Sequence, residues 1–400
     1  MHLPSKRLMF TGACLVGAAL ATNATRSPFA AFAQAPAAPR PQLSEQAFKN
    51  IQVLKGIPVD EFMGTMGLFS AALSVCCGDC HVGAGGDNPD WAADPPRKKI
   101  ARQMITMVSN INKTNFNGAQ RITCWTCHRG VSEPAATPSI DTIYSEPVVP
   151  PSDVLKTATS GVPTVDQIFD KYIQSIGGAA NLAKMTSWSA KGTAISFGTA
   201  NKADSAEIYA KAPAEYATII NQDGGAMERV TDGRNAWVQL PLTVVKLYPL
   251  NDSALEGGKL DGKIAFPQNI KSFFPTWHVS FPSTLDVSET DSEGRVIKSD
   301  QRDVYVVQGT GNPQGMFATF YFDRQNGHLL RMIRYAKSAM GRVPTQIDWS
   351  DFRPVAGGVT MPHKFVYGWV SGREGYTLTE ITPNAQVPDS KFARPTLPAK

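Results

Sequence analysis

The placement of the cysteines is the strongest constraint in this sequence. Cys14 lies near the N-terminus, and the other five of the six cysteines fall between positions 76 and 127. Four of those five form two copies of the pattern C-x-x-C-H, at residues 77–81 and 124–128. This pattern is the attachment signature of c-type haem, so we predict two covalently bound c-type haems as cofactors.

The spacing within the motif suits one turn of a helix. Positions i, i+3 and i+4 share a helix face, so two sulfurs can hold the porphyrin edge while the following imidazole faces the iron. We therefore expect two thioether bonds and one axial nitrogen from each motif. The attachment residues are Cys77, Cys80, Cys124 and Cys127, and the axial histidines are His81 and His128.

Other uses of paired cysteines are the alternatives. A thioredoxin-like redox pair needs no histidine directly after it and needs a βαβ context, which neither copy has. A structural zinc or disulfides would leave the two adjacent histidines unexplained. Cys76 could form a variant C-x-x-x-C-H with Cys80, but we assign the ordinary spacing and expect Cys76 to be a small packed residue.

Methionines upstream of each motif are candidates for the second axial position, which methionine closes to small ligands. Residues 59–69 and 97–112 are predicted as helices, because apolar side chains recur on one face of each. Met66 lies on the first apolar stripe and Met104 on the second. Core packing is the other reading of such stripes, since methionine fills gaps readily.

The N-terminus is typical of an export signal. Basic residues precede an apolar stretch over residues 8–21, and residues 31–33 have the A-x-A form that a signal peptidase recognises. The stretch is shorter than the roughly 20 residues that a spanning helix needs, which favours cleavage over anchoring. We predict Gln34 as the first mature residue and a periplasmic location, with membrane association left open. Because Cys14 lies inside the apolar stretch, we discount lipidation.

The composition indicates globular domains without a nucleic-acid partner. Of 400 residues, 42% are hydrophobic and 18% are charged, which excludes disorder and a multi-span membrane protein. Removal of the signal, with Lys6, Arg7 and Arg26, lowers the formal charge from +5 to +2. So small a charge gives no argument for nucleic acid.

We expect a multidomain protein. An N-terminal, mostly α-helical dihaem cytochrome c domain is followed by a C-terminal α+β domain dominated by a curved antiparallel sheet, half-barrel-like in form. The predicted parts are a signal peptide (1–33), a flexible leader (34–47), the cytochrome domain (48–133), a proline-rich linker (134–164) and the β-rich domain (165–400).

The β-rich domain is predicted from short aromatic and β-branched segments between turn residues. A helix over residues 165–182, ending at Gly177-Gly178, comes first. Asn326-Gly327 is a strong hairpin signal. The predicted strands are 206–210, 216–220, 236–240, 304–307, 316–322, 329–335, 345–348, 363–367 and 376–381.

The segments around both motifs resemble the cytochrome c subunit of photosynthetic reaction centres and its shorter dihaem relatives. The similarity covers about residues 50–134. It runs through V-L-K-G-I-P at 53–58, E-F-M at 61–63, C-G-D-C-H at 77–81, I-A-R-Q-M at 100–104 and I-T-C-W-T-C-H-R-G at 122–130. In that family, a helix with the axial methionine precedes each attachment helix.

The resemblance implies the remaining ligands and a function. Met66 and Met104 fall on the family's axial positions, with Met63 and Met107 as second choices. The reaction-centre members carry four haems, whereas this chain has two motifs, and residues 115–117 (N-F-N) replace a family histidine. A reaction centre is thus one candidate partner, and a respiratory or other periplasmic role is equally compatible.

The β-rich part resembles in pattern the half-barrel of periplasmic lipoprotein-carrier proteins, which enclose an apolar ligand. A lipid or quinone is therefore a candidate ligand, and a self-packed docking domain is the alternative. His278, His328 and His363 lack metal-ligand spacing, so we read them as ordinary residues. No nucleophile-elbow pattern occurs, and we assign no catalytic residues.

The leading functional hypothesis is an exported dihaem cytochrome that carries single electrons between periplasmic or membrane redox proteins and is not an enzyme. A dihaem enzyme such as a peroxidase is the alternative, since it would need one open axial position. A lipid- or quinone-binding protein is the third hypothesis.

Overall fold

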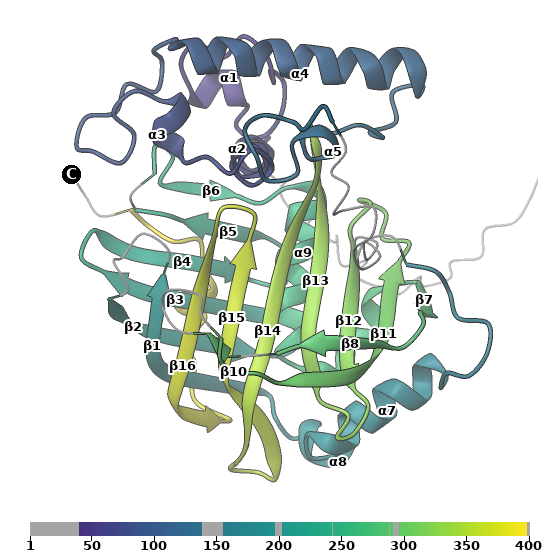
Figure 1. Cartoon of the computed structure of the whole chain (residues 1–400). Helices are drawn as coiled ribbons and strands as arrows, with labels where there is room; N and C mark the ends of the chain where they lie inside the picture. The colour runs from purple at the N-terminus through teal and green to yellow at the C-terminus, as the bar shows by residue number, and fades with distance from the viewer. Residues whose placement is uncertain are drawn as a thin grey trace, which may run out of the picture. The chain divides into compact units, whose positions relative to one another are not determined.

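The computed structural model describes residues 40–137, 155–196, 202–241, 243–287, 289–290 and 296–397. From Pro41 onward the described chain forms one compact unit. We call residues 40–137 the helical region and residues 155–397 the sheet region (Figure 1). The predicted signal, its cleavage site before Gln34, Cys14 and most of the proline-rich linker lie outside the described residues.

Two long helices dominate the helical region, as the sequence predicts. Helix α2 (Val59–Leu73) has acidic residues in its first turn, where the positive end of the helix dipole favours them. Helix α4 (Pro96–Asn115) begins with a proline, whose missing N–H costs no hydrogen bond there. The short helices are α1 (Ser44–Ala47), α3 (Cys77–Cys80) and α5 (Cys124–His128). None of the described helices is long and apolar enough to cross a membrane.

One large antiparallel sheet forms most of the sheet region. Its strands follow the order β6-β5-β4-β3-β2-β1-β16-β15-β14-β13-β12-β11-β7, with β8 also paired to β11. Strand β1 pairs with β16, which joins the two halves of the sheet. The strands of the first half are β1 (Ser187–Ser196), β2 (Ala203–Lys211), β3 (Glu215–Gln222), β4 (Gly225–Thr231), β5 (Ala236–Gln239) and β6 (Leu247–Pro249).

The second half of the sheet follows after two helical segments. Its strands are β7 (Thr276–Val279), β8 (Ser283–Asp286), β11 (Gln301–Thr310), β12 (Phe317–Asp323), β13 (Leu329–Ser338), β14 (Gly341–Val355), β15 (Val359–Trp369) and β16 (Gly372–Pro383). Strands β9 (Glu289–Thr290) and β10 (Val296–Lys298) form a separate pair. The helices of this region are α7 (Val165–Ser175), α8 (Ala179–Leu182), α9 (Asp252–Ile264), η1 (Pro267–Phe273) and η2 (Asp389–Phe392).

The sheet curves around helix α9, which contacts strands from both halves (Figure 1). A Cβ atom on Gly262 would lie 2.1 Å from the carbonyl oxygen of Ala214, at the start of β3. A Cβ atom on Gly257 would lie 2.3 Å from the guanidinium of Arg334 on β13. Because only glycine fits at such distances, these two positions allow the helix to lie between the halves of the sheet.

The expected curved antiparallel sheet is therefore confirmed. Each of the nine predicted strand segments overlaps an observed strand. Asn326 and Gly327 form the turn between β12 and β13, with Gly327 at φ +83°. Residues 165–182 form two helices rather than one, since the first ends at Ser175, just before the predicted glycine pair.

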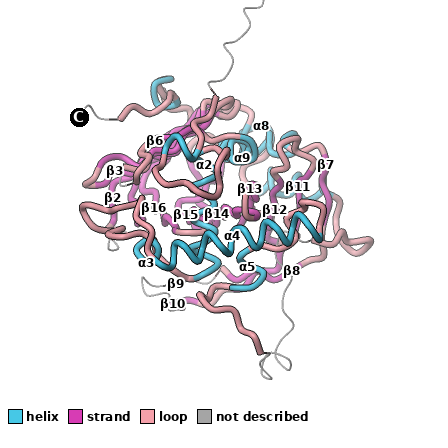
Figure 2. The backbone as a smooth tube through the Cα atoms, turned by 90° about the horizontal axis from the view of Figure 1, so that it is seen from above, coloured by secondary structure: helices cyan, strands magenta, loops and turns pink. Residues whose placement is uncertain are grey.

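The helical region packs on one end of the curved sheet. Both carboxylate oxygens of Asp60 in α2 accept hydrogen bonds from Asn251, at 2.7 and 2.8 Å. The side chain of Gln120 donates to the carbonyls of Ser338 and Ala339, each at 2.8 Å. Figure 2 shows α2, α4 and α5 lying across the strand ends.

Shared apolar contacts strengthen this packing. Met340, in the turn between β13 and β14, is buried in one cluster with Leu68 of α2 and Ile105 of α4. The small core of the helical region thus includes a side chain of the sheet region. Burial raises the pKa of Asp60, although the hydrogen bonds from Asn251 oppose this effect.

Two glycines of α2 test the closeness of this contact. Gly64→Ala should raise the free energy of unfolding by up to about 1 kcal/mol, because alanine favours helix and the new Cβ would meet Val343 at 3.5 Å, an ordinary contact. Gly67→Ala places a Cβ 2.7 Å from a methyl of Val370, so it should lower that free energy by about 1–3 kcal/mol.

The measurement is chemical denaturation followed by circular dichroism of both variants. Gly64→Ala serves as the matched control, since it makes the same substitution one turn away. If Gly67→Ala were as stable as Gly64→Ala, α2 would not be packed tightly against the turn between β15 and β16.

Candidate functional site

The first motif lies in a single helical turn, as its spacing requires. Cys77 is exposed, Cys80 is half-buried, and His81 ends helix α3 in an extended conformation. A carboxylate oxygen of Asp79 accepts a hydrogen bond from the backbone N–H of Cys76 at 2.8 Å, which lowers the pKa of Asp79. Arg97 at the start of α4 pairs with the same carboxylate at 3.2 Å.

Cys76 corrects one sequence-based expectation. It is exposed rather than packed, and its sulfur lies 3.2 Å from an oxygen of Asp79. Its backbone forms the N-cap of α3. The residue therefore begins the attachment helix instead of filling the core.

The second motif also occupies one short helix, α5. Cys127 is exposed, whereas Cys124 packs into the small core of the helical region, where burial raises the pKa of its thiol. After the motif, Gly130 adopts φ +86° and its N–H donates to the carbonyl of Ala72 at 2.9 Å. This hydrogen bond ties the motif to the end of α2.

Both motif histidines present a form that suits a metal. Nδ1 of His128 lies 3.1 Å from the carbonyl oxygen of Val131, which can only accept, so Nδ1 carries the proton and Nε2 remains for a ligand. His81 is half-buried beside Trp91, with ring centroids 5.1 Å apart. Burial lowers the pKa of His81, and the charge of Lys98 lowers it further, which favours the neutral imidazole that binds iron.

A buried polar atom at the first motif supports the same use. Nδ1 of His81 is buried and has no hydrogen-bond partner within the described part of the chain. Buried nitrogen atoms are rarely left unpaired unless a metal, a water or a functional role accounts for them. The donor set of this site therefore fits a haem.

Apolar side chains beside the motifs are exposed in a way that also fits a haem. Val82, Trp125 and Val131 are each about half exposed, at 50%, 49% and 50%, and Ile100 on α4 is 54% exposed. Exposed apolar side chains of this size beside an attachment motif are compatible with a surface that another group covers. A porphyrin, which is large and flat with apolar faces, suits such surroundings.

The candidate methionines lie in different environments. Met66 on α2 and Met104 on α4 are half-buried. Met63 instead packs with Val59 and the sheet region, and Met107 is 43% exposed. The position of Met63 against the sheet makes it less suited to ligate iron than Met66.

The packing of the short helices bears on how the ligands pair. Helix α3, with the first motif, packs against α4, which carries Met104. Helix α5, with the second motif, packs against α2, which carries Met66. Each attachment helix thus contacts the methionine helix of the other unit, and the pairing of histidines with methionines needs its own test.

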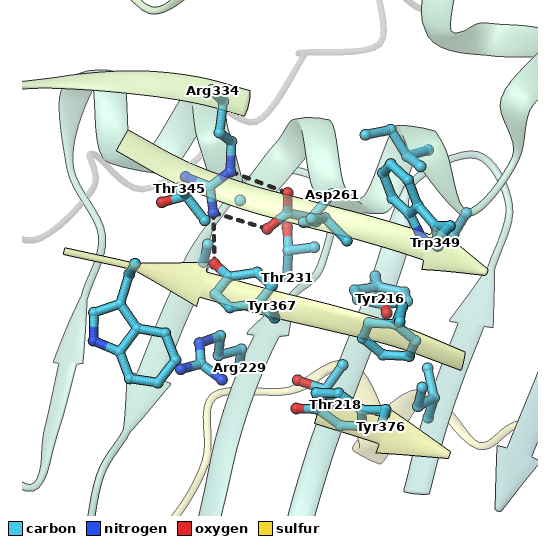
Figure 3. Close-up of a pocket in the computed structure, with 18 of the residues that line it drawn as sticks. Tyr216, Thr218, Arg229, Thr231, Asp261, Arg334, Thr345, Trp349, Tyr367 and Tyr376 are labelled. Atoms are coloured by element: carbon cyan, nitrogen blue, oxygen red, sulfur yellow. Dashed lines mark hydrogen bonds and ion pairs between the residues drawn. The ribbon is translucent and has the colours of Figure 1, made fainter. Parts of the chain in front are cut away.

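A second group of polar residues, which the sequence analysis missed, lies inside the curved sheet (Figure 3). Arg229 of β4 makes a two-pronged ion pair with the fully buried Glu374 of β16, at 2.6 and 2.8 Å. Arg334 pairs with Asp261 of α9 at 2.9 and 3.1 Å. Arg334 also donates to the hydroxyl of Tyr367 at 2.7 Å, and Arg229 lies over the ring of the same tyrosine.

The sequence contained a signal for these residues. Met332, Arg334 and Ala336 alternate on the inner face of β13, and Glu374 precedes Tyr376 on the inner face of β16. A charged side chain at a core-facing strand position requires a buried partner. The partners come from distant strands, so the pattern could not identify them.

Comparison with known proteins bears on the part of the chain that holds the two motifs. Residues 11–177 match the family model of the photosynthetic reaction centre cytochrome C subunit. The N-terminal part of this chain is similar to that family. Similar photosynthetic reaction center cytochrome c subunits come from Roseobacter denitrificans (30% identity over 100 residues) and Thermochromatium tepidum (35% over 95 residues).

The similarity to these cytochrome subunits is partial in both directions. The two alignments cover 24% and 22% of this chain, and 27% and 22% of the relatives. The chain thus spans about a quarter of the length of the curated relatives that it matches.

Some solved structures align with part of this chain. A LolA superfamily protein from Nitrosomonas europaea aligns with 58% of this chain and 98% of its own, at 13% identity and a TM-score of 0.34. A DUF1329 family protein from Desulfovibrio piger has the same coverage, at 12% identity and a TM-score of 0.36.

Cysteine substitutions test the attachment sites. Cys77→Ser and Cys124→Ser should each lower the covalent haem content from two to one per chain, because each removes a thioether sulfur from one motif. Cys76→Ser is the matched control and should retain two. Haem content is measured as the pyridine haemochrome and by the mass of the intact chain.

The control also distinguishes the two spacings at the first motif. Loss of a haem in Cys76→Ser, with retention in Cys77→Ser, would assign the longer C-x-x-x-C-H spacing.

Proposed function

We propose that this protein is an exported c-type cytochrome that holds two covalent haems and passes single electrons between redox partners in the periplasm or at a membrane. The observation that carries the proposal is the pair of C-x-x-C-H motifs, each in one helical turn with a histidine suited to iron. The family match supports it, because the matching relatives are cytochrome c subunits.

Different residues of the chain would anchor each haem and ligate its iron. Cys77 and Cys80 would anchor one porphyrin and Cys124 and Cys127 the other, which prevents loss of the cofactor. Haem iron, when bound, supplies the one-electron chemistry. The described helices would hold the axial side chains in place on a rigid sheet, so that coordination stays constant and little reorganisation accompanies transfer.

We propose His81 and His128 as proximal ligands, with Met66 and Met104 opposite them. Chain order in the resembling family pairs Met66 with His81 and Met104 with His128. Methionine in the sixth position would exclude small ligands and raise the potential. Apolar side chains near the motifs, among them Phe69, Ile111 and Trp125, would limit the access of water to the iron.

The partners are proposed from the same similarity. A photosynthetic reaction centre is one candidate, since the matching relatives are named as subunits of it. A respiratory or other periplasmic redox protein is the other candidate. The periplasmic location rests on the export signal predicted at residues 1–33.

A haem enzyme such as a peroxidase is the competing function. It would need one iron with an open or displaceable sixth position. The exposed Met107 and the sheet-bound Met63 leave Met66 and Met104 as the methionines on which this choice depends.

Methionine substitutions with carbon monoxide as the probe separate the two functions. The reduced wild-type protein should bind no carbon monoxide, whereas Met66→Ala and Met104→Ala should each bind about one per chain and show one high-spin haem. Met63→Ala and Met107→Ala are the matched controls and should remain low-spin. Carbon monoxide binding by the wild type would favour the enzyme.

The pairing of ligands is tested in a chain with one haem. Cys77→Ala with Cys80→Ala should leave only the second haem. Adding Met104→Ala to that chain should then make the remaining haem high-spin, while adding Met66→Ala should not. The reverse result would show that each methionine serves the motif whose helix packs against its own.

A further inference from the structure

The curved sheet and helix α2 enclose a cavity of about 340 Å³. This volume lies near the lower end of the range of small-molecule sites, about 300–1,000 Å³. Met63, Gly64 and Gly67 of α2 form part of the wall, and Val343, Ile347 and other inward side chains of the sheet form the rest.

Aromatic rings make up much of the wall. They include Trp188, Tyr216, Trp349, Phe365, Tyr367 and Tyr376. Phe365 and Tyr376 stack with centroids 4.2 Å apart. Flat rings on several strands favour a ligand that is itself flat and aromatic.

The arginines at the cavity already have carboxylate partners, and the carboxyl group of Asp60, which also lines the cavity, accepts two hydrogen bonds. Arg229 is paired with Glu374, and Arg334 with Asp261, through four hydrogen bonds of 3.1 Å or less. No further lysine or arginine of the described residues lines the cavity. An anionic ligand would therefore find no spare cation, whereas an uncharged ligand meets no electrostatic penalty.

Hydrogen-bond donors remain available at the cavity wall, among them two on aromatic residues. The hydroxyl of Tyr216 and the indole N–H of Trp349 line the cavity, and neither has a hydrogen-bond partner among the residues that the structure describes (Figure 3). Burial raises the pKa of Tyr216, so its hydroxyl keeps its proton as a donor. Donors in an otherwise apolar pocket select a ligand with an acceptor such as a carbonyl oxygen.

From these observations we propose that the cavity binds an uncharged aromatic carbonyl compound, with its rings between the aromatic side chains and its oxygen at the hydroxyl of Tyr216. The site is separate from the haem motifs and does not depend on the electron-carrier function.

The experiment is equilibrium dialysis of the full mature protein against flavone, a flat, uncharged aromatic ketone. The wild type should bind about one flavone per chain. Palmitate, an anionic acyl chain, should bind at least ten-fold more weakly. Palmitate binding as tight as that of flavone, or no binding of flavone, would overturn the proposal.

Two variants locate the binding. Tyr216→Phe removes only a hydroxyl and should weaken flavone binding about three- to ten-fold, the value of one hydrogen bond. Thr218→Phe, whose native side chain lines the cavity, should abolish binding by filling it. Tyr305→Phe, outside the cavity wall, is the matched control and should bind as the wild type does.

The conservative variant decides the outcome if Thr218→Phe does not fold. Equal affinities for the wild type, Tyr216→Phe and Tyr305→Phe would show that flavone binds elsewhere or without the proposed donor, and the proposal would be wrong. Dialysis does not read the haems, so this result is independent of their ligation.

Discussion

Close contact between helix α9 and the sheet is the interaction on which the sheet region depends. Gly257 and Gly262 let the helix touch β13 and the start of β3 at once, so the sheet wraps around it instead of lying flat. The inward side chains then converge and leave a cavity between them. The open end of that cavity is covered by α2, again through small residues, Gly64 and Gly67. Residues without side chains thus determine both the curvature of the sheet and its closure.

The sequence predicted those features that depend on local pattern. Residues 77–81 and 124–128 identified the haem motifs by spacing alone, and alternation or turn residues located most strands. The sequence did not predict helix α9, because its three glycines lower helix propensity and only tertiary contacts stabilise it. The pairing of Arg229 with Glu374 could not be predicted because 145 residues separate the two partners. Contacts over such separations depend on the order in which the strands pair in the sheet.

Two buried ion pairs lie inside the curved sheet, and each joins an arginine to a carboxylate. Removing a charged group from water is costly, and here each arginine has a two-pronged carboxylate partner and a tyrosine nearby. Tyr367 joins both pairs, since it accepts from Arg334 and lies under Arg229. A polar network that is satisfied in this way holds strands β4, β13, β15 and β16 in one register with α9. It also leaves neither of these arginines without a carboxylate partner.

Helix α2 has two faces with different neighbours. Met63, Gly64 and Gly67 face the sheet, while Met66 lies on the stripe with Phe62 and Phe69, roughly on the opposite side of the helix. Helix α2 therefore has the interior of the sheet on one side and a candidate iron ligand on the other. A displacement of α2 would change both the cavity wall and the surroundings of Met66. If a ligand in the cavity and ligation by Met66 both depended on the position of α2, each would change the binding free energy of the other by the same amount.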